Sequence, residues 1–153
     1  MTKSAYKVIE KLQGKTIATA ESCTGGAIGA ALTAVPGASK VYKGSVVSYC
    51  NEIKEKLLGV SAEVRSFYGA VSPVVAEAMA KGAREALNTD IAVSVTGLAG
   101  PDGDEYGNPV GTVYIGFANE KHTLFRRHMF MGSREEIRSQ AVEAAMAMIL
   151  EYA

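Results

Sequence analysis

The sequence predicts an α/β fold, a three-layer α/β/α domain with a mixed, mostly parallel sheet and one antiparallel hairpin. Apolar β-like runs alternate with helical runs along most of the 153 residues, and this alternation is typical of such domains. Two strand-like runs near the end, 113–118 and 121–130, are joined across Asn119 and Glu120, which predicts the hairpin. The length fits a single domain over 1–153, with no internal repeat or linker.

Hydrophobic periodicity and helix-end signals place the individual elements. The strands expected before the hairpin are 16–20, 42–49 and 90–95. The helices expected are 4–13, 24–35, 52–58 with Asn51 as N-cap, a short piece capped by Ser61, a long one that starts at Ser72-Pro73 and runs to about Asn88, and a last one opened by the capping box Ser133 and Glu136. The strand 90–95 is mostly apolar, so we expect it at the centre of the sheet, buried on both faces.

The charge balance argues against several classes of partner. Lysine plus arginine and aspartate plus glutamate both number 16, so the formal net charge is zero. We therefore expect neither nucleic acid nor a membrane surface as a partner, and interpret the basic run 126–128 as the exposed face of a strand. No run approaches the ~18 apolar residues that span a bilayer. The first residues lack the apolar core of a signal peptide, so a cytoplasmic protein is expected.

Cysteine and histidine usage predicts neither a metal site nor a disulfide framework. The sequence holds Cys23, Cys50, His122 and His128, with no Cys-x-x-Cys or His-x-x-x-His pair. No cofactor is expected either. Helices rich in alanine and methionine would serve a homo-oligomeric interface as well as a core, so the oligomeric state stays open.

The segment Ala20–Gly26 is the first candidate for chemistry. It joins an apolar strand to a helix of small residues, so Ser22 lies at a strand-to-helix turn, beside the free N–H groups of a helix start. Such a turn suits a nucleophile with an oxyanion hole. A simpler interpretation is that Ser22 or Thr24 caps the helix. Cys23 is a second candidate nucleophile, because helix starts favour thiolates, although a small half-buried neighbour is the commoner role.

A second strand-to-helix junction carries Tyr49 and Lys54. If it lies beside the first, both side chains reach Ser22, and a lysine with a lowered pKa is able to act as the base that a serine needs. Tyr49 would then hydrogen-bond the pair or relay a proton. A Ser-His-Asp arrangement would need His122 or His128, and both lie on hairpin strands away from the expected loops. The alternative is that Lys54 is an ordinary exposed helix lysine.

Two further segments are candidate anion sites. The glycine-rich loop from Thr96 through Gly97 and Gly100 presents backbone N–H groups that are able to form an anion nest, or it is a plain turn. Arg134 and Arg138 lie one turn apart at a helix N-terminus, where positive charge opposes the helix dipole. A bound phosphate would offset this mismatch, whereas solvation or pairing with glutamate would also explain the arginines.

Five motifs in this order resemble the CinA C-terminal domain family over about residues 5–150. They are Ala20–Gly26, Gly44–Tyr49 with Asn51 and Lys54, Gly69–Ser72, Thr96–Gly103 and Pro109–Val113. Larger CinA proteins carry a further N-terminal domain, whose activity is not transferred to this chain. Cys50 and the segment 104–106 depart from the family pattern without touching the candidate catalytic positions.

The resemblance implies an amidohydrolase that converts nicotinamide mononucleotide and water to nicotinate mononucleotide and ammonia. It implies that Ser22 attacks the carboxamide carbon, with Lys54 and Tyr49 handling the proton and no metal involved. The substrate's 5′-phosphate is expected near Arg134, Arg138 and the loop from Thr96 to Gly100. The small-molecule nucleotide is thus the expected partner.

The predicted mechanism is an acyl-enzyme route. Neutral Lys54 takes the Ser22 proton, backbone N–H groups of Cys23, Thr24 and Gly25 hold the oxyanion, and water hydrolyses the acyl-enzyme. Two alternatives stay open. One is a non-catalytic nucleotide- or phosphate-binding module, which would not need hydroxyl, phenol and amine together. The other is a serine–lysine amidase for a different amide.

Overall fold

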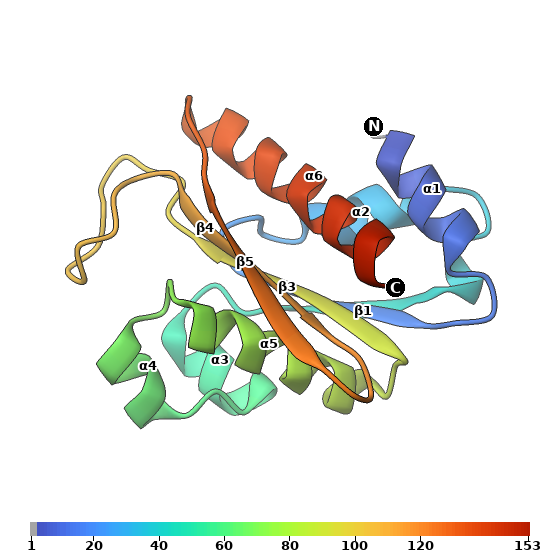
Figure 1. Ribbon diagram of the computed structural model, residues 1–153, viewed down its shortest axis with the longest axis horizontal. Coiled ribbons are helices and arrows are strands. Elements are labelled where there is room, and N and C mark those ends of the chain that lie inside the picture. Colours follow the sequence, from blue (N-terminus) through green and yellow to red (C-terminus); the bar gives the residue numbers. More distant parts are fainter. Residues whose placement is uncertain (1–2) are drawn as a thin grey trace.

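The computed structural model describes residues 3–153, which form a three-layer α/β/α domain around a five-stranded sheet (Figure 1). The strands are β1 (Ile17–Glu21), β2 (Tyr42–Val47), β3 (Ile91–Gly97), β4 (Thr112–Ala118) and β5 (Thr123–Met129). The α-helices are α1 (Lys3–Lys11), α2 (Ala27–Thr33), α3 (Asn51–Leu58), α4 (Ala62–Tyr68), α5 (Pro73–Leu87) and α6 (Arg134–Tyr152), and a 3-10 turn, η1, covers Ala38–Lys40. The predicted fold class is confirmed.

The sheet has the strand order β2-β1-β3-β4-β5. β1 pairs in parallel with both β2 and β3, whereas β4 is antiparallel to β3 and to β5. Four strands therefore point the same way and only β4 runs against them, which confirms the mixed, mostly parallel sheet and its hairpin. β3 occupies the centre, as its apolar sequence predicts, and all but its last residue are buried.

Helices cover both faces of this sheet, and the connections that follow β1 and β2 lie on opposite faces. Figure 1 shows α1, α2 and α6 on one face and α3, α4 and α5 on the other. The chain leaves β1 through α2 on the first face and leaves β2 through α3 to α5 on the second. Since β2 and β3 flank β1, the connections diverge between β1 and β3. In open α/β sheets the crevice at the carboxyl ends of such strands is where ligands bind.

Two apolar layers hold the helices to the sheet, and their side chains differ in size. Ile17, Val93 and Val95 face the layer that α1, α2 and α6 cover. Ala18 and Ala92 point to the opposite face, where they pack against α5. Each branched side chain that is fully buried contributes about 1.5–3 kcal/mol. The methionine and alanine stripe of α6 lies in the first layer, so the core accounts for it within one chain.

Most predicted helix ends are confirmed, and two are wrong. Ser61, Ser72 and Ser133 cap α4, α5 and α6, the last through the predicted capping box with Glu136. The N-cap of α3 is Cys50 rather than Asn51, since Asn51 already has helical backbone. Among residues 3–153, no helix is long and apolar enough to cross a membrane.

The helix predicted at 24–35 begins at Ala27 instead. Gly25 and Gly26 have φ of +61° and +102°, which L side chains rarely adopt, so the chain makes a separate turn before α2 starts. The N-cap residue of α2 is Gly26, which has no side chain to cap the helix. The simpler interpretation, in which Ser22 or Thr24 is the N-cap, is therefore wrong.

Candidate active site

Ser22 lies at the carboxyl edge of the three parallel strands. Glu21 pairs in register with Val47 of β2 and with Val95 of β3, so the residues that follow these three strand positions, Ser22, Ser48 and Thr96, come level with one another. Backbone bonds extend this alignment, because the Ser22 N–H donates to the Val95 carbonyl at 3.1 Å and the Ser48 N–H donates to the Glu21 carbonyl at 2.7 Å. The register therefore brings together segments that are far apart in sequence.

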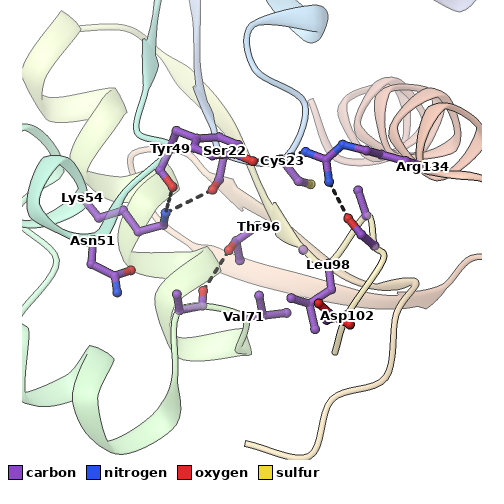
Figure 2. Close-up of a pocket in the computed structure, with 14 residues that line it drawn as sticks. Ser22, Cys23, Tyr49, Asn51, Lys54, Val71, Thr96, Leu98, Asp102 and Arg134 are labelled. Carbon is purple, nitrogen blue, oxygen red and sulfur yellow. Dashed lines mark hydrogen bonds between the residues drawn. The ribbon is translucent and has the colours of Figure 1, made fainter. Parts of the chain in front are cut away.

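Lys54 reaches Ser22 from the first turn of α3. Figure 2 shows its side chain extending from the helix toward the Ser22 hydroxyl, and the distance from Nζ to Oγ is 3.1 Å. The Nζ atom also donates to the carbonyls of Ser48 at 2.7 Å and Tyr49 at 3.5 Å. Lys54 is only 2% exposed. The alternative of an exposed helix lysine is wrong, and the expected contact between Ser22 and Lys54 is confirmed.

The surroundings of Lys54 disfavour its charged form. Burial lowers the pKa of its ammonium group to about 8, since the charged form loses its hydration. No carboxylate forms a salt bridge with it among residues 3–153. The Nζ atom donates to the Ser22 hydroxyl and to the two carbonyls, and once it loses a proton its lone pair would be free to accept the Ser22 O–H. Lys54 is therefore suited to accept the serine proton.

Glu21 is a buried carboxylate that sequence reasoning did not assign to any role. It is fully buried, and its two oxygens accept five hydrogen bonds. The donors are the hydroxyls of Thr19 and Thr24 and the backbone N–H groups of Gly26, Ile28 and Gly29. The carboxylate thus satisfies the free N–H groups at the start of α2 and complements the helix dipole. A lone acid between an apolar strand and a small-residue helix was the signal that could have revealed it.

Hydroxyl groups extend the Glu21 network across the sheet to β2. The Thr19 hydroxyl bonds to Glu21 and to the hydroxyl of Ser45, which lies 2.5 Å from the Tyr42 hydroxyl. A Cβ atom at Gly29 would lie 2.5 Å from the Tyr42 hydroxyl oxygen, so only glycine lets α2 approach the Tyr42 side chain this closely. The turn 22–26, called the nucleophile turn because it carries the candidate nucleophile Ser22, is therefore tied to two strands as well as to α2.

The two arginines of α6 do different things, although the sequence grouped them. Arg138 donates from Nε to the Cys23 carbonyl at 2.9 Å and from Nη2 to the Thr24 carbonyl at 3.1 Å. Arg134 donates to the Gly100 carbonyl at 2.5 Å and to the Tyr49 hydroxyl at 3.1 Å. Arg134 lines the cavity beside Ser22, and Arg138 is not among its lining residues within 3–153. This geometry does not favour the expectation that Arg134 and Arg138 bind one phosphate together.

A cavity of about 270 Å³ opens in front of Ser22 and Lys54. Its walls come from α3, α6 and the end of β3, and from the segments that follow β1, β2 and β3 and precede α5 (Figure 2). The lining residues are Ser22, Cys23, Tyr49, Asn51, Lys54, Ala70, Val71, Thr96, Gly97, Leu98, Ala99, Gly100, Asp102 and Arg134. The predicted loop residues Thr96, Gly97 and Gly100 therefore do border the site. The Thr96 hydroxyl donates to the Ala70 carbonyl at 2.8 Å, so it fixes one wall.

Tyr49 lines the cavity but does not hydrogen-bond the serine–lysine pair through its phenol. Its hydroxyl accepts from Arg134, and only its backbone carbonyl contacts Lys54. Tyr49 lines the cavity and is 63% exposed. The expectation that the phenol hydrogen-bonds Ser22 or Lys54 is therefore wrong for this arrangement, in which the phenol oxygen accepts from Arg134. Its predicted proton-handling role stays a prediction.

Cys23 also lines the cavity, next to Ser22 in the chain. Its thiol is buried, and burial raises its pKa to about 11, so it is protonated near neutral pH. A protonated thiol is a poor nucleophile. The geometry thus favours the hydroxyl of Ser22, which has a base at 3.1 Å, over the neighbouring thiol.

The described residues of this site do not form a cluster of metal-ligating side chains. Across residues 3–153, no group of three or more histidine, cysteine, aspartate or glutamate side chains is placed to hold a metal ion. Ser22 and Lys54 are themselves not a typical ligand pair for zinc or magnesium. The arrangement can supply a nucleophile, a base and backbone donors from this chain alone.

The fold and site define an α/β/α domain with a serine–lysine pair at the carboxyl edge of its parallel strands. The chain belongs to the CinA C-terminal domain family, which it matches over residues 1–153. It is similar to the solved competence/damage inducible protein CihA of Agrobacterium tumefaciens, with 37% identity and a TM-score of 0.93 over 97% of this chain and 92% of that one. A CinA superfamily protein of Escherichia coli is 34% identical, with a TM-score of 0.91 over 97% of this chain and 86% of that one.

Longer relatives carry the same domain as one part of their sequence. A putative competence-damage inducible protein of Caldanaerobacter subterraneus is 44% identical over 152 residues, which are 99% of this chain and 37% of that protein. A protein of the same description from Moorella thermoacetica is 47% identical over 134 residues, 88% of this chain and 32% of that protein. The chain therefore spans about a third of the length of these curated relatives.

Proposed function

We propose that this protein hydrolyses the carboxamide of nicotinamide mononucleotide, giving nicotinate mononucleotide and ammonia. The observation that carries the proposal is the buried Lys54 amine, which has no carboxylate partner in the described chain and lies 3.1 Å from the Ser22 hydroxyl, at the wall of a cavity. A serine with a lysine base is suited to amide hydrolysis. The choice of amide comes from the family resemblance, which the match to the CinA C-terminal domain supports.

The acylation step uses the pair directly. Neutral Lys54 accepts the Ser22 proton while Oγ forms a bond to the carboxamide carbon, and the carbonyl oxygen takes the negative charge. The C–N bond then breaks, and the lysine ammonium returns the proton to the nitrogen, so ammonia leaves. In the second half, water gives a proton to Lys54 and its oxygen to the acyl carbon, and the proton then returns to Ser22. Atoms and charges balance without an outside reactant.

The phosphate of the substrate is best accommodated at the cavity mouth, beside Arg134. This guanidinium is exposed and uses some of its N–H donors on Gly100 and Tyr49, which leaves others for phosphate oxygens. The Tyr49 ring at the same rim offers a flat surface to the nucleotide. Arg138 is not part of this phosphate site. Both cysteines are free thiols, which fits the reducing cytoplasm as the proposed location.

Ammonia release from nicotinamide mononucleotide tests the proposal. The wild type is assayed with EDTA beside Ser22→Ala, against a panel that includes nicotinamide riboside, nicotinamide and glutamine. We expect turnover of the mononucleotide in EDTA, and a loss of at least about 10⁴-fold in kcat/KM for Ser22→Ala, because the nucleophile is gone. Turnover of another amide alone would replace the substrate and keep the chemistry. A ligand-induced rise in melting temperature without any turnover would favour a binding module instead.

A further inference from the structure

The loop after β3 places a carboxylate on the wall of the cavity in front of Ser22. Among the lining residues within 3–153, Lys54 and Arg134 carry basic side chains, and Asp102 alone carries an acidic one. Figure 2 shows Asp102 and Leu98 on one side of the cavity and Ser22 on the other. A ligand that fills the cavity therefore meets both the candidate nucleophile and this carboxylate.

The carboxylate of Asp102 is not used by the fold. Within residues 3–153 it forms no salt bridge, and no donor hydrogen-bonds to it. The neighbouring acids differ from it, because Glu21 accepts five hydrogen bonds outside the cavity lining and Asp104 accepts three within its own loop. The charge of Asp102 is therefore available to a ligand.

The backbone on both sides of Asp102 is held in place, although the residue itself is exposed. Two positions before it, the Gly100 carbonyl accepts from Arg134 at 2.5 Å. One position after it, Gly103 lies so close to Asn108 that a Cβ atom would be 2.6 Å from the Asn108 carbonyl oxygen. The carboxylate is thus carried by a segment that is anchored at both ends, next to the cavity.

The nucleophile turn contributes only Ser22 and Cys23 to the described lining of the cavity. The sequence predicts that Thr24 and Gly25 also contact the substrate, but neither lines the cavity within residues 3–153. Thr24 is fully buried, and the Gly25 N–H donates to the Ser22 carbonyl at 3.0 Å. Apart from the base, the charged groups that a ligand meets therefore come from the loop after β3 and from α6.

We infer that Asp102 is a specificity residue that selects amides carried on a positively charged ring. The inference rests on the proposed function, because nicotinamide mononucleotide is a pyridinium with a positive ring and a negative phosphate. Arg134 complements the phosphate and Asp102 complements the ring, so the two charges of the cavity wall match the two charges of the nucleotide. Attraction between opposite charges does not require direct contact.

The test compares nicotinamide mononucleotide with its reduced 1,4-dihydro form, which has the same ribose, phosphate and carboxamide but a neutral ring. KM is measured for the oxidised nucleotide, and the reduced one is measured as a competitive inhibitor. The proteins compared are the wild type, Asp102→Asn, which keeps the shape without the charge, and Asp102→Glu. Glu105→Gln is the matched control, because Glu105 is an exposed acid of the same loop outside the described lining of this cavity.

Removing the charge should raise KM for nicotinamide mononucleotide by about 3- to 10-fold, in the range of an ion pair at a partly solvated site. The inhibition constant of the reduced nucleotide should stay unchanged, so the preference for the charged ring shrinks by the same factor. Asp102→Glu should keep part of this preference, and added salt should weaken it in the wild type but not in Asp102→Asn. Glu105→Gln should behave as the wild type.

Three outcomes would overturn the inference, and they are distinguishable. An unchanged KM in Asp102→Asn would make Asp102 a solvated loop residue. An equal loss for the charged and the neutral nucleotide would mean that Asp102 binds the ribose hydroxyls or shapes the loop, since both ligands share these contacts. A wild type that does not hydrolyse nicotinamide mononucleotide would remove the proposed function and the inference together, before any variant is compared. Melting curves establish that the compared variants are folded.

Discussion

The nucleophile turn and the glycine-rich loop after β3 border the same cavity, but they are held very differently. The turn is fixed by the Glu21 carboxylate on one side and the Arg138 guanidinium on the other, and most of its residues are buried. Half of the residues in the loop from 98 to 111 are exposed, and the loop projects from the domain (Figure 1). Its middle is organised by Asp104, which accepts from Asn108 and from the Tyr106 N–H.

This difference indicates a division between chemistry and recognition. Atoms that form and break bonds must be held within fractions of an ångström, and the turn has the buried hydrogen bonds to do so. A loop with an exposed backbone opens at little cost and is able to adapt to a ligand. Arg134 belongs to the second group, since its bonds go to the loop at Gly100 and to the exposed Tyr49.

Replacing Lys54 by methionine should have opposite effects on activity and stability. We expect kcat/KM to fall by about 10³–10⁴-fold, because the base is lost. The melting temperature at pH 7 should rise, because methionine fills the buried space without a charge to solvate. Lys56→Met, on an exposed position of the same helix, is the matched control and should change neither quantity.

The stability gain should itself depend on pH. The pKa of Lys54 is about 8 in the folded protein and near ~10.4 in the unfolded chain, so below pH 8 burial of the charge costs stability in full. As the pH rises from 8 to about 10.4, the folded lysine is already neutral and the cost disappears. The difference in melting temperature between Lys54→Met and the wild type should therefore shrink over this range. An unchanged difference would contradict a buried ammonium group.

Replacing Arg134 by methionine should affect binding rather than chemistry. We expect KM for nicotinamide mononucleotide to rise by about 10- to 100-fold, the value of a charge-assisted hydrogen bond, with kcat nearly unchanged. Nicotinamide riboside, which lacks the phosphate, should show no change. Arg127→Met, on the exposed face of β5, serves as control. Equal losses in kcat for both substrates would mean that the recognition side takes part in the chemistry.

Deleting one hydroxyl in each region should give the smallest and most direct comparison. Thr19→Val removes a donor from the buried Glu21 carboxylate and should lower the free energy of unfolding by about 1–3 kcal/mol. Tyr106→Phe removes an exposed bond to the Ser66 carbonyl and should change it by at most about 0.5 kcal/mol. Urea unfolding measures both. Similar losses would show that the two regions are equally rigid.

Much of the fold was predictable because its signals are local. The alternation of apolar strands with helices, the capping serines and the hairpin across Asn119 all act over a few residues, and each is found where the sequence places it. The contact of Ser22 with Lys54 was also predictable, since parallel strands bring their carboxyl ends to one edge. The start of α2 was not predictable, because Gly25 and Gly26 form a turn within a segment whose residue pattern is that of a helix.

The sequence pattern did not predict the roles of the charged side chains around the nucleophile turn. Glu21 and Arg138 act through backbone groups, and the direction of a carbonyl or N–H is set by three-dimensional packing rather than by spacing in the sequence. Arg134 and Arg138 look equivalent along a helix, yet one turn of α6 separates a cavity wall from the back of the nucleophile turn. The sequence likewise placed Tyr49 at the correct strand-to-helix junction, but its hydroxyl accepts a hydrogen bond from Arg134.

The most direct test of the central claim is a titration of Lys54 in the free protein. Lysine side chains labelled with ¹³C are followed by NMR from pH 6 to 12, with Lys54→Met used to assign the resonance. We expect one lysine that titrates near pH 8 and disappears in the variant, beside others near ~10.4. If Lys54 titrates with the exposed lysines near ~10.4, its neutral form is too scarce at neutral pH for it to be the base that activates Ser22.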